Sequence, residues 1–330
     1  MQEPSEGPVL HVPARDIPVP AGLSPQAKAM MAQAGPALPP WPPQDDIEAW
    51  RATIERMDEQ GLAGLSMMSR GADVEVAEIE VGGVRVYDVT PRDLGPGDQA
   101  VYLDIHGGSL LWGGGESCRA MGIITAGMVR ARVWAVDYRL PPDHPYPAPL
   151  DDCVAAYRGL LTERAADDII IGGASAGGNM APATVLRARD EGLPLPAALV
   201  LLTPEADLTE SGDTFSTLLG VDTALTSSLM PANLLYAGGH DLAHPYLSPL
   251  FGDFTQGFPP TFLVSGTRDL FLSNTVRLHR ALRSAGVPAD LHVYDAATHV
   301  GFAFGPEAED RTRELRDFTS RHWGRPASAG

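Results

Sequence analysis

The sequence is poor in cysteine, in basic residues and in long apolar runs. Only Cys118 and Cys153 occur among 330 residues, so no disulfide framework is implied and a reducing compartment fits. Both thiols are predicted to be buried, as small hydrophobic side chains. No apolar run approaches the ~20 residues of a membrane-spanning helix. These absences argue against a disulfide-stapled scaffold and against a membrane partner.

Positive charge is also scarce: 24 Lys and Arg face 42 Asp and Glu, which gives a formal net charge of −18. Phosphates would be repelled by this balance, so no nucleic-acid partner is expected. The N-terminus has neither the basic start nor the apolar core of a secretory signal, and we therefore expect a cytoplasmic protein. A hydrophobic content of 44% is sufficient for a large buried core.

The first 74 residues precede any predicted strand. Residues 1–23 are rich in proline and are expected to be extended. Ser24 is predicted to cap a short helix that runs through Met31. Asp45 is predicted to cap a clearer helix that ends at Gly61. Two helices placed before the first strand suggest a cap laid over a later core.

From Glu75 the pattern changes to alternating strands and helices. Two alternating segments joined by Gly82-Gly83 predict a hairpin. The remaining predicted strands are Ala100–Ile105, Val133–Asp137, Ile169–Ile171, Ala198–Leu202, Thr261–Val264 and Leu291–Tyr294. The predicted helices between and after them are Glu116–Val129, Ala148–Thr162, Ala176–Arg189, Ser273–Ala285 and Pro306–His322. This order predicts an α/β fold with a mostly parallel eight-stranded sheet and helices on both faces.

One long stretch interrupts the alternation, since 205–258 contains no convincing strand and many turn residues. An insertion of this length between two strands is typically functional, such as a lid. We therefore divide the chain into an N-terminal cap segment (1–74), a first part of the core (75–204), an inserted cap or lid segment (205–258) and a second part of the core (259–330).

A lone hydroxyl, Ser175, stands within Gly173-Ala174-Ser175-Ala176-Gly177, between a predicted strand and a predicted helix. In this context G-x-S-x-G is typical of a nucleophile elbow, a sharp turn that projects the serine Oγ above the sheet edge. The glycines could instead serve strand–helix packing or a phosphate-binding turn. However, this segment has neither the G-x-G-x-x-G of dinucleotide sites nor a P-loop lysine.

A nucleophilic serine also needs donors for an oxyanion. His106-Gly107-Gly108 follows the strand Ala100–Ile105, and its glycines leave room for a substrate oxygen. We predict that the N–H groups of Gly107, Gly108 and Ala176 form the oxyanion hole. His106 is interpreted as a structural residue that braces this loop. A plain Gly-Gly turn would explain the glycines but not the histidine.

The acid and the base are sought after later strands, where ligands bind in open α/β sheets. Asp269 lies just past Thr261–Val264, and His299 follows the last strand. The order Ser175, Asp269, His299 is the one expected of an α/β-hydrolase. Asp295 is the second candidate for the acid, because it shares a loop with His299.

Two further histidines, His240 and His244, have a spacing of four that would suit a metal pair on a helix. Glycines and a proline crowd them, and no third ligand is obvious nearby, so solvated lid residues are the favoured interpretation. We predict no metal site and no cofactor.

Three segments together resemble a known family: "HGGS", "DYRLPPDHPYPAPLDD" and "GGASAGGN". They are similar to the hormone-sensitive-lipase-type (alpha/beta-hydrolase-3) microbial carboxylesterases, over about residues 75–323, and most similar to epsilon-lactone hydrolase-like members. The resemblance implies the α/β-hydrolase fold, the same triad and hole, and a cap built from the N-terminal helices and the insertion. Departures from the family pattern include Ser109 after the hole glycines, Ala174 before the serine and Val300 after the histidine. The resemblance leaves homodimer formation open.

These residues predict hydrolysis of carboxylic esters, with lactones included, through an acyl-enzyme. The alternatives are an acyltransferase that uses the same intermediate and a non-catalytic, hormone-binding member of the fold. The expected partner is a small-molecule ester, for which Ser109, Leu218 and Leu219 are the candidate binding residues. Apolar cap residues suggest a pocket for short or medium acyl chains, although packing of the cap on the core explains them equally well. These cap residues are Met30, Met31, Trp41, Leu218, Leu219, Leu225, Met230, Leu234 and Leu235.

Overall fold

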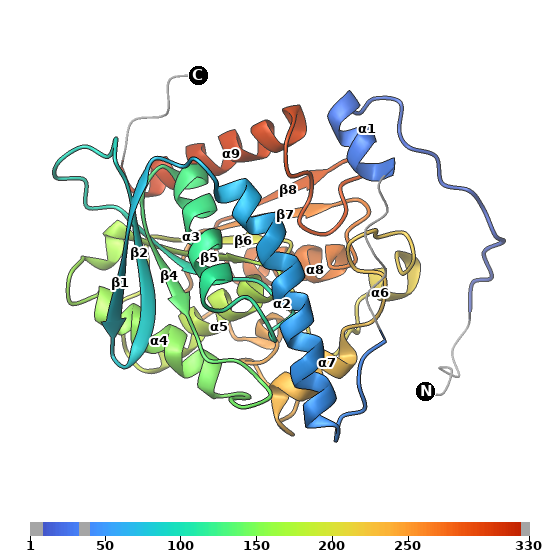
Figure 1. The fold of residues 1–330 in the computed structure, drawn as a ribbon, viewed down its shortest axis with the longest axis horizontal. Coiled ribbons are helices and arrows are strands. Elements are labelled where there is room, and N and C mark those ends of the chain that lie inside the picture. The colour runs from blue at the N-terminus through green and yellow to red at the C-terminus, as the bar shows by residue number, and fades with distance from the viewer. Residues whose placement is uncertain (1–8, 33–39, 325–330) are drawn as a thin grey trace.

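The computed structural model describes residues 9–32 and 40–324, and these form a single eight-stranded sheet with helices packed on it (Figure 1). The strand order is β1-β2-β4-β3-β5-β6-β7-β8. Strand β2 pairs antiparallel with both β1 and β4 at one edge of the sheet. All other neighbouring strands are parallel. The predicted mostly parallel α/β sheet is therefore confirmed.

The sheet begins with the predicted hairpin, β1 (Val74–Val81) and β2 (Val84–Pro91). Gly82 and Gly83 connect them with φ values of 61° and 83°, a conformation that glycine adopts without strain. The other strands are β3 (Val101–Ile105), β4 (Arg132–Asp137), β5 (Ile169–Ala174), β6 (Ala198–Leu202), β7 (Thr261–Gly266) and β8 (Ala289–Tyr294).

Two apolar layers cover the two faces of the sheet. One layer contains side chains of α3 (Glu116–Val129) and α9 (Pro306–His322), including Ile123 and Phe318. The other contains α4 (Ala148–Leu160), α5 (Ala176–Asp190) and α8 (Leu272–Ser284). Cys118 and Cys153 lie one in each layer, unpaired and buried, as the sequence predicts.

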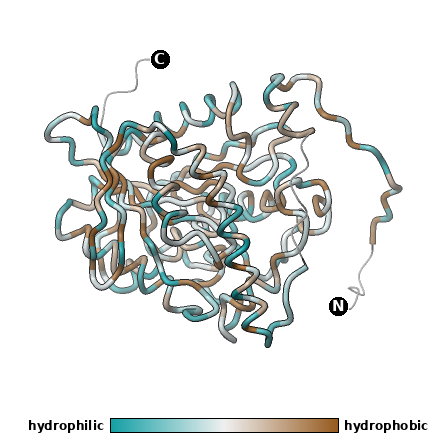
Figure 2. Tube along the Cα trace, in the orientation of Figure 1, coloured by the Kyte–Doolittle hydropathy of each residue, from teal (hydrophilic) through white to brown (hydrophobic). Residues whose placement is uncertain are grey.

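Coverage on both faces explains why the central strands are continuously apolar. Strand β6 reads Ala-Leu-Val-Leu-Leu, and four of its five residues are buried. Figure 2 shows the hydrophobic segments gathered along the strands and many hydrophilic ones at the periphery. Among the described residues, no helix combines the length and the apolar character needed to cross a bilayer.

The N-terminal helices differ from their predicted bounds. Helix α1 (Pro25–Ala32) is capped by Ser24 as expected, because Ser24 Oγ accepts a hydrogen bond from Ala27 N at 3.1 Å. Helix α2 (Ile47–Ser69) is capped by Asp46, not Asp45, through a 3.0 Å bond from Ala49 N.

Helix α2 also continues past Gly61, where the sequence predicts its end. A Cβ at Gly61 would overlap the indole ring of Trp112. The glycine therefore permits a close approach between α2 and the loop after β3, and the helix does not need it as a terminator. Helix α2 continues along α3 as a second layer (Figure 1).

The inserted segment contains α6 (Thr214–Thr217), α7 (Met230–Ala237) and a short 3-10 turn, η2 (Pro249–Phe251), but no strand within its described residues. It contacts the N-terminal segment directly. Trp41 donates a hydrogen bond from Nε1 to the carbonyl of Ser228 at 2.9 Å, and Trp50 packs with Ala232 of α7. The N-terminal segment and the inserted segment are therefore in direct contact.

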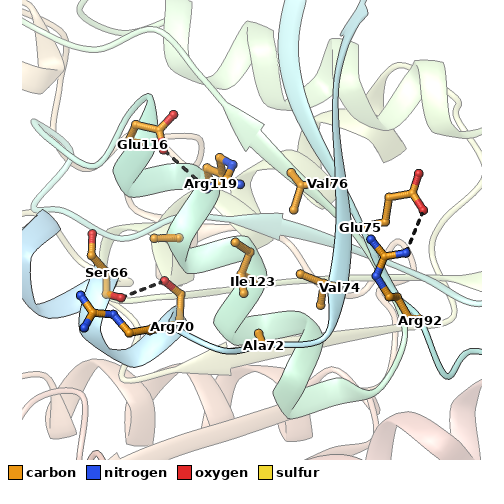
Figure 3. A pocket seen from close by; sticks show the side chains of 12 residues that line it. Ser66, Arg70, Ala72, Val74, Glu75, Val76, Arg92, Glu116, Arg119 and Ile123 are labelled. Carbon is orange, nitrogen blue, oxygen red and sulfur yellow. Dashed lines mark hydrogen bonds and ion pairs between the residues drawn. The ribbon is translucent and has the colours of Figure 1, made fainter.

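A surface hollow of about 530 Å³ lies between α2, α3 and β1 (Figure 3). Four of its five charged side chains pair with one another, Arg119 with Glu116 at 3.6 Å and Arg92 with Glu75 at 3.8 Å. None of the predicted catalytic residues lines it. This hollow is therefore separate from the serine, histidine and aspartate considered below.

Two glycines of α3 provide a test of how tightly this helix packs on the sheet. A Cβ at Gly122 would lie 2.7 Å from Ala135 Cβ, whereas one at Gly127 would meet nothing within 4 Å. We expect Gly122→Val to lower the free energy of unfolding by roughly 2–3 kcal/mol, because the strand cannot yield. Gly127→Val in the same helix should change it by less than about 0.5 kcal/mol. Urea denaturation of both variants measures this, and equal midpoints would contradict the packing described.

Candidate active site

Ser175 occupies the turn between the end of β5 and the start of α5. Its φ and ψ are 57° and −118°, a conformation that non-glycine residues rarely adopt. Such strain is a feature of a nucleophile elbow, in which the turn lifts the serine Oγ clear of the sheet. Helix α5 begins with the next residue, so its N-terminal N–H groups point toward the space above the serine.

The glycines around Ser175 have a specific neighbour, the carbonyl oxygen of Ile105 at the end of β3. A Cβ on Gly173 would lie 2.4 Å from this oxygen, and a Cβ on Gly177 would overlap it outright. The packing interpretation of these glycines and the elbow interpretation therefore describe the same geometry. Close approach of β3, β5 and α5 is what makes the turn sharp.

The structure brings Ser175, His299 and Asp269 together. His299 Nε2 lies 2.8 Å from Ser175 Oγ, and His299 Nδ1 lies 3.2 Å from Asp269 Oδ1. Asp269 is fully buried and His299 is 5% exposed. Asp295, the second candidate for the acid, is exposed.

Asp269 is oriented by its own loop after β7. Its Oδ2 accepts a hydrogen bond from Ser265 Oγ at 2.6 Å, and its Oδ1 accepts one from Phe271 N at 3.0 Å. The ring of Phe271 contacts the imidazole of His299 edge-on, with 4.8 Å between the ring centroids. The carboxylate and the imidazole plane are thus both held by neighbouring groups.

The loop after β3 lies against the elbow. A Cβ on Gly107 would be 2.8 Å from the carbonyl oxygen of Ala174 and 3.5 Å from Ser175 Cβ. Gly108 has a φ of 131°, which a larger residue would not tolerate. Within residues 9–32 and 40–324, the N–H groups of Gly107, Gly108 and Ala176 donate to no acceptor. They are therefore available to a substrate oxygen.

His106 stacks on Tyr138, with ring centroids 3.9 Å apart and planes 10° from parallel. Its Nδ1 lies 2.8 Å from the carbonyl oxygen of Gly107, and Tyr138 Oη donates to the carbonyl oxygen of His106 at 2.8 Å. Burial lowers the pKa of His106 to about 4. A neutral, stacked ring agrees with the bracing role expected of it.

Among the described residues, one group of three donors, His106, Cys118 and Asp137, has ligand atoms within 4.8 Å of one another. Its carboxylate already has other partners, and its thiol resists ionisation. Asp137 accepts a hydrogen bond from Gly115 N at 2.9 Å and pairs with Arg85, and burial raises the pKa of the Cys118 thiol well above its usual range. A metal would have to displace Arg85 and ionise the thiol, so these residues do not fit a metal.

The two histidines of the insertion are exposed and flank the ring of Tyr146. The ring centroids are 5.0 Å apart for His240 and 6.3 Å for His244. This arrangement is that of solvated side chains around an aromatic ring.

The three candidate substrate residues lie in different environments. Ser109 is half-buried in the loop after β3, with a φ of 52°. Leu218 packs against the apolar cluster that contains Phe271, and Phe271 contacts His299. Leu219, by contrast, is 47% exposed and belongs to no apolar cluster of the described residues.

Most apolar residues of the cap pack on the core or on each other. Met30 and Met31 contact the loop that carries His299, through Ala296, Ala297 and Phe302. Trp41, Leu225 and Leu235 also lie within apolar clusters. These contacts agree with a packing role, and they do not test whether any of these side chains also binds substrate.

Several residues that hold the site were not predicted from the sequence. Ser265 and Phe271, described above, lie on either side of Asp269 in the chain. Asp222 of the inserted segment accepts hydrogen bonds from backbone N–H groups of two loops, the one after β7 and the one after β8. The Asp222-Thr223-Ala224 stretch indicates a local turn from sequence. Its long-range bonds depend on tertiary contacts that carry no sequence signal.

Glu205 is a second missed acidic residue, placed directly after β6 at the back of the elbow. Its backbone N–H donates to the carbonyl oxygen of Ser175 at 3.2 Å. Its side chain is fully buried, and within the described parts of the chain neither carboxyl oxygen accepts a hydrogen bond of good geometry; Asn233 acts on it to lower its pKa, against the larger effect of burial. Burial raises the pKa of Glu205 to about 8, so the carboxyl group is largely protonated at neutral pH.

Glu205→Gln tests this protonation through stability. The pKa of Glu205 is about 8 in the folded protein against an ordinary 4.5, so its contribution to stability is full below pH 4.5 and is lost as pH rises through 8. We expect the unfolding free energy of Glu205→Gln, relative to wild type, to rise by on the order of 3 kcal/mol between pH 5 and pH 9.

Urea denaturation at pH 5, 7 and 9 measures this difference. Glu59→Gln, on an exposed position of α2, serves as the control and should give curves parallel to wild type. Parallel curves for Glu205→Gln as well would show that its carboxyl group ionises without cost.

Comparison with known proteins agrees with this geometry. A family model described as "alpha/beta hydrolase fold" matches residues 102–303. An acetyl-hydrolase of Streptomyces hygroscopicus is 34% identical over 220 residues, which cover 66% of this chain and 73% of the relative. An esterase of Acinetobacter venetianus is 28% identical over 253 residues, 75% of this chain and 82% of the relative.

Solved structures give the same result. The crystal structure of esterase E25 has a TM-score of 0.88 and 36% identity, covering 95% of this chain and 99% of that one. A hormone-sensitive lipase from a metagenome library has a TM-score of 0.73 and 32% identity, covering 85% of this chain and 99% of that one. The predicted fold, family and enzyme class, carboxylic ester hydrolases, are therefore confirmed. The chain belongs to the alpha/beta-hydrolase fold family and, within it, to the microbial esterases of the hormone-sensitive-lipase type.

Proposed function

We propose that this protein is a serine carboxylesterase in which Ser175 is the nucleophile, His299 the general base and Asp269 the acid that orients the base. The single observation that carries the proposal is the hydrogen-bonded chain from Ser175 Oγ through both nitrogens of His299 to Asp269. A serine hydroxyl is a weak nucleophile by itself, and an imidazole at 2.8 Å is positioned to accept its proton.

In acylation, Ser175 Oγ attacks the carbonyl carbon of the ester while its proton passes to His299 Nε2. Asp269 keeps the Nδ1 proton of His299 on the side away from the serine and stabilises the imidazolium. His299 then returns the proton to the leaving alcohol. The products of this half-reaction are the free alcohol and an ester of Ser175.

In the tetrahedral intermediate the negatively charged oxygen is proposed to lie between the loop after β3 and the start of α5. The N–H groups of Gly107, Gly108 and Ala176 are proposed as its donors. Among the residues that the structure describes, these groups donate to no other acceptor, which supports this role, and one such donor is worth about 10²–10³ in rate in other hydrolases.

Deacylation uses the same groups with water as the nucleophile. His299 removes a proton from the water as its oxygen attacks the acyl carbon. The bond from that carbon to Ser175 Oγ then breaks, His299 returns the proton to Oγ, and the carboxylic acid leaves. An acyltransferase would follow the same scheme with an alcohol in place of water. Product analysis with added alcohol separates the two. The position of His299 against Ser175 argues for catalysis over ligand binding alone.

We propose short or medium acyl esters, with lactones included, as the substrate class. One relative is named an acetyl-hydrolase, and crystals of the related esterase EstE5, 27% identical, were soaked with p-nitrophenyl butyrate. Ser109 and Leu218 are the proposed contacts nearest the reacting groups. Leu219, which is largely exposed, remains a proposed contact only for a substrate that reaches the cap surface.

Ser175→Ala tests the nucleophile. The variant should lose at least about 10⁴-fold in kcat on p-nitrophenyl butyrate, because no other hydroxyl lies against His299 Nε2 in the described structure. Wild type should gain the mass of one phosphonate on Ser175 after treatment with a phosphonate ester, and the variant should gain none. Ser284→Ala, on an exposed position of α8, should behave like wild type. Hydrolysis retained by Ser175→Ala would overturn the assignment.

A series of p-nitrophenyl esters from acetate to palmitate tests the substrate class. We expect kcat/KM to peak between about two and eight carbons, since each CH₂ buried on apolar surface adds up to about 0.8 kcal/mol only while the pocket can accommodate it. Leu218→Ala should shift the peak and Leu234→Ala, an exposed change in α7, should not. A maximum at long chains would exclude the proposed preference.

A further inference from the structure

A buried carboxylate of the inserted segment, that of Asp222, lies under both loops that carry the acid and the base. It follows α6 and precedes α7, and it is 1% exposed. It is neither part of the proposed triad nor of the oxyanion loop. A buried carboxylate is costly to place in a protein unless other groups satisfy it, so its partners indicate why it is there.

Asp222 accepts hydrogen bonds from four backbone N–H groups. Two belong to its own turn: Ala224 N and Leu225 N lie 2.8 and 3.2 Å from Oδ1. The other two come from distant parts of the chain. Leu270 N lies 2.8 Å from Oδ2, and His299 N lies 3.2 Å from the same oxygen.

The two distant donors are significant because of their neighbours. Leu270 directly follows Asp269, and His299 is itself the proposed base. One oxygen atom of Asp222 therefore joins the loop after β7 to the loop after β8. These loops must keep a fixed distance for His299 Nδ1 to remain at 3.2 Å from Asp269.

The segment that carries Asp222 is itself anchored to the loop after β7. Thr214 Oγ1 donates to the carbonyl oxygen of Leu270 at 2.7 Å, and Leu225 and Leu229 pack with Leu270 and Phe271. The carboxylate therefore acts from a rigid support. If the segment that carries Asp222 were mobile, its carboxylate could not hold the two loops in place.

The loop after β8, which carries His299, needs an external support more than the loop after β7, which carries Asp269. Ala296 and Val300, on either side of His299, have φ values of 55° and 60°, which are unfavourable for residues other than glycine. Such a conformation persists only where surrounding contacts determine it. The bond from His299 N to Asp222 lies between the two strained residues.

Electrostatics acts in the same direction. Burial raises the pKa of Asp222, while attraction to His299 and the N–H groups around it favour the carboxylate. An imidazolium forms at His299 in each half-reaction of the proposed mechanism, and a second negative charge beside it would stabilise that cation.

We propose that Asp222 is a positioning residue, by which the inserted segment holds His299 and Asp269 in the geometry required for proton transfer from Ser175. The proposal rests on the serine mechanism proposed above. It assigns to the insertion a direct part in the alignment of the base, in addition to any contact with substrate.

Asp222→Asn tests this role, because an amide keeps the size of the side chain but removes the charge and one acceptor. We expect kcat on p-nitrophenyl butyrate to fall about 10- to 100-fold, with KM changed less than about twofold, since misalignment acts on the chemical step. The downfield proton NMR signal of His299 Nδ1–H should broaden or disappear. Asp213→Asn, an exposed acid of the same segment, should leave kcat and the signal unchanged.

The same measurements are made on the smaller variant Asp222→Ser, and thermal unfolding is recorded for both variants. Unchanged kcat with an intact NMR signal in Asp222→Asn would overturn the proposal. The proposal would be overturned equally if KM rose together with a large fall in the melting temperature, or if both variants failed to fold. Either result would show that Asp222 serves the stability of the fold and not the alignment of His299. Activity that survives in Ser175→Ala would instead refute the serine mechanism, while the NMR signal still reports on His299.

Discussion

The structure depends on one close contact, between the carbonyl oxygen of Ile105 at the end of β3 and the glycines that flank Ser175. Only residues without a Cβ allow β3, β5 and the start of α5 to approach this closely. The approach forces Ser175 into a left-handed conformation and places Gly107 against its Cβ. The strained turn and the free N–H groups beside it thus have a common physical origin.

The remaining members of the site reach the serine because parallel strands end at one edge of the sheet. Asp269 follows β7 and His299 follows β8, two strands that are hydrogen-bonded neighbours. Other groups hold these side chains in place. Ser265 Oγ and Phe271 N donate hydrogen bonds to Asp269, and His106 stacks on Tyr138 beside the loop after β3. A buried constellation of polar groups requires this support, because an unsatisfied buried group would destabilise the fold.

Local patterns predicted the elements well where tertiary packing agreed with them. The glycine hairpin, the buried strands and the helices after them lie within a few residues of their expected bounds. The exceptions have specific causes. Gly61 serves a contact with Trp112 and does not end its helix. Asp46 and not Asp45 is the cap because its side chain reaches Ala49 N. The sequence pattern of two adjacent aspartates does not distinguish them.

The sequence by itself determined the fold class and singled out Ser175 and His299 as candidates, because each follows a strand in an order with few alternatives, but it left Asp269 and Asp295 as two candidates for the acid. Only the tertiary structure placed Asp269 against His299 and left Asp295 exposed, since the distance from either carboxylate to His299 depends on how two loops pack. It also revealed Asp222 and Glu205, whose partners lie far away in the chain. Burial and long-range hydrogen bonds arise from the assembled molecule, and no local pattern of residues specifies them.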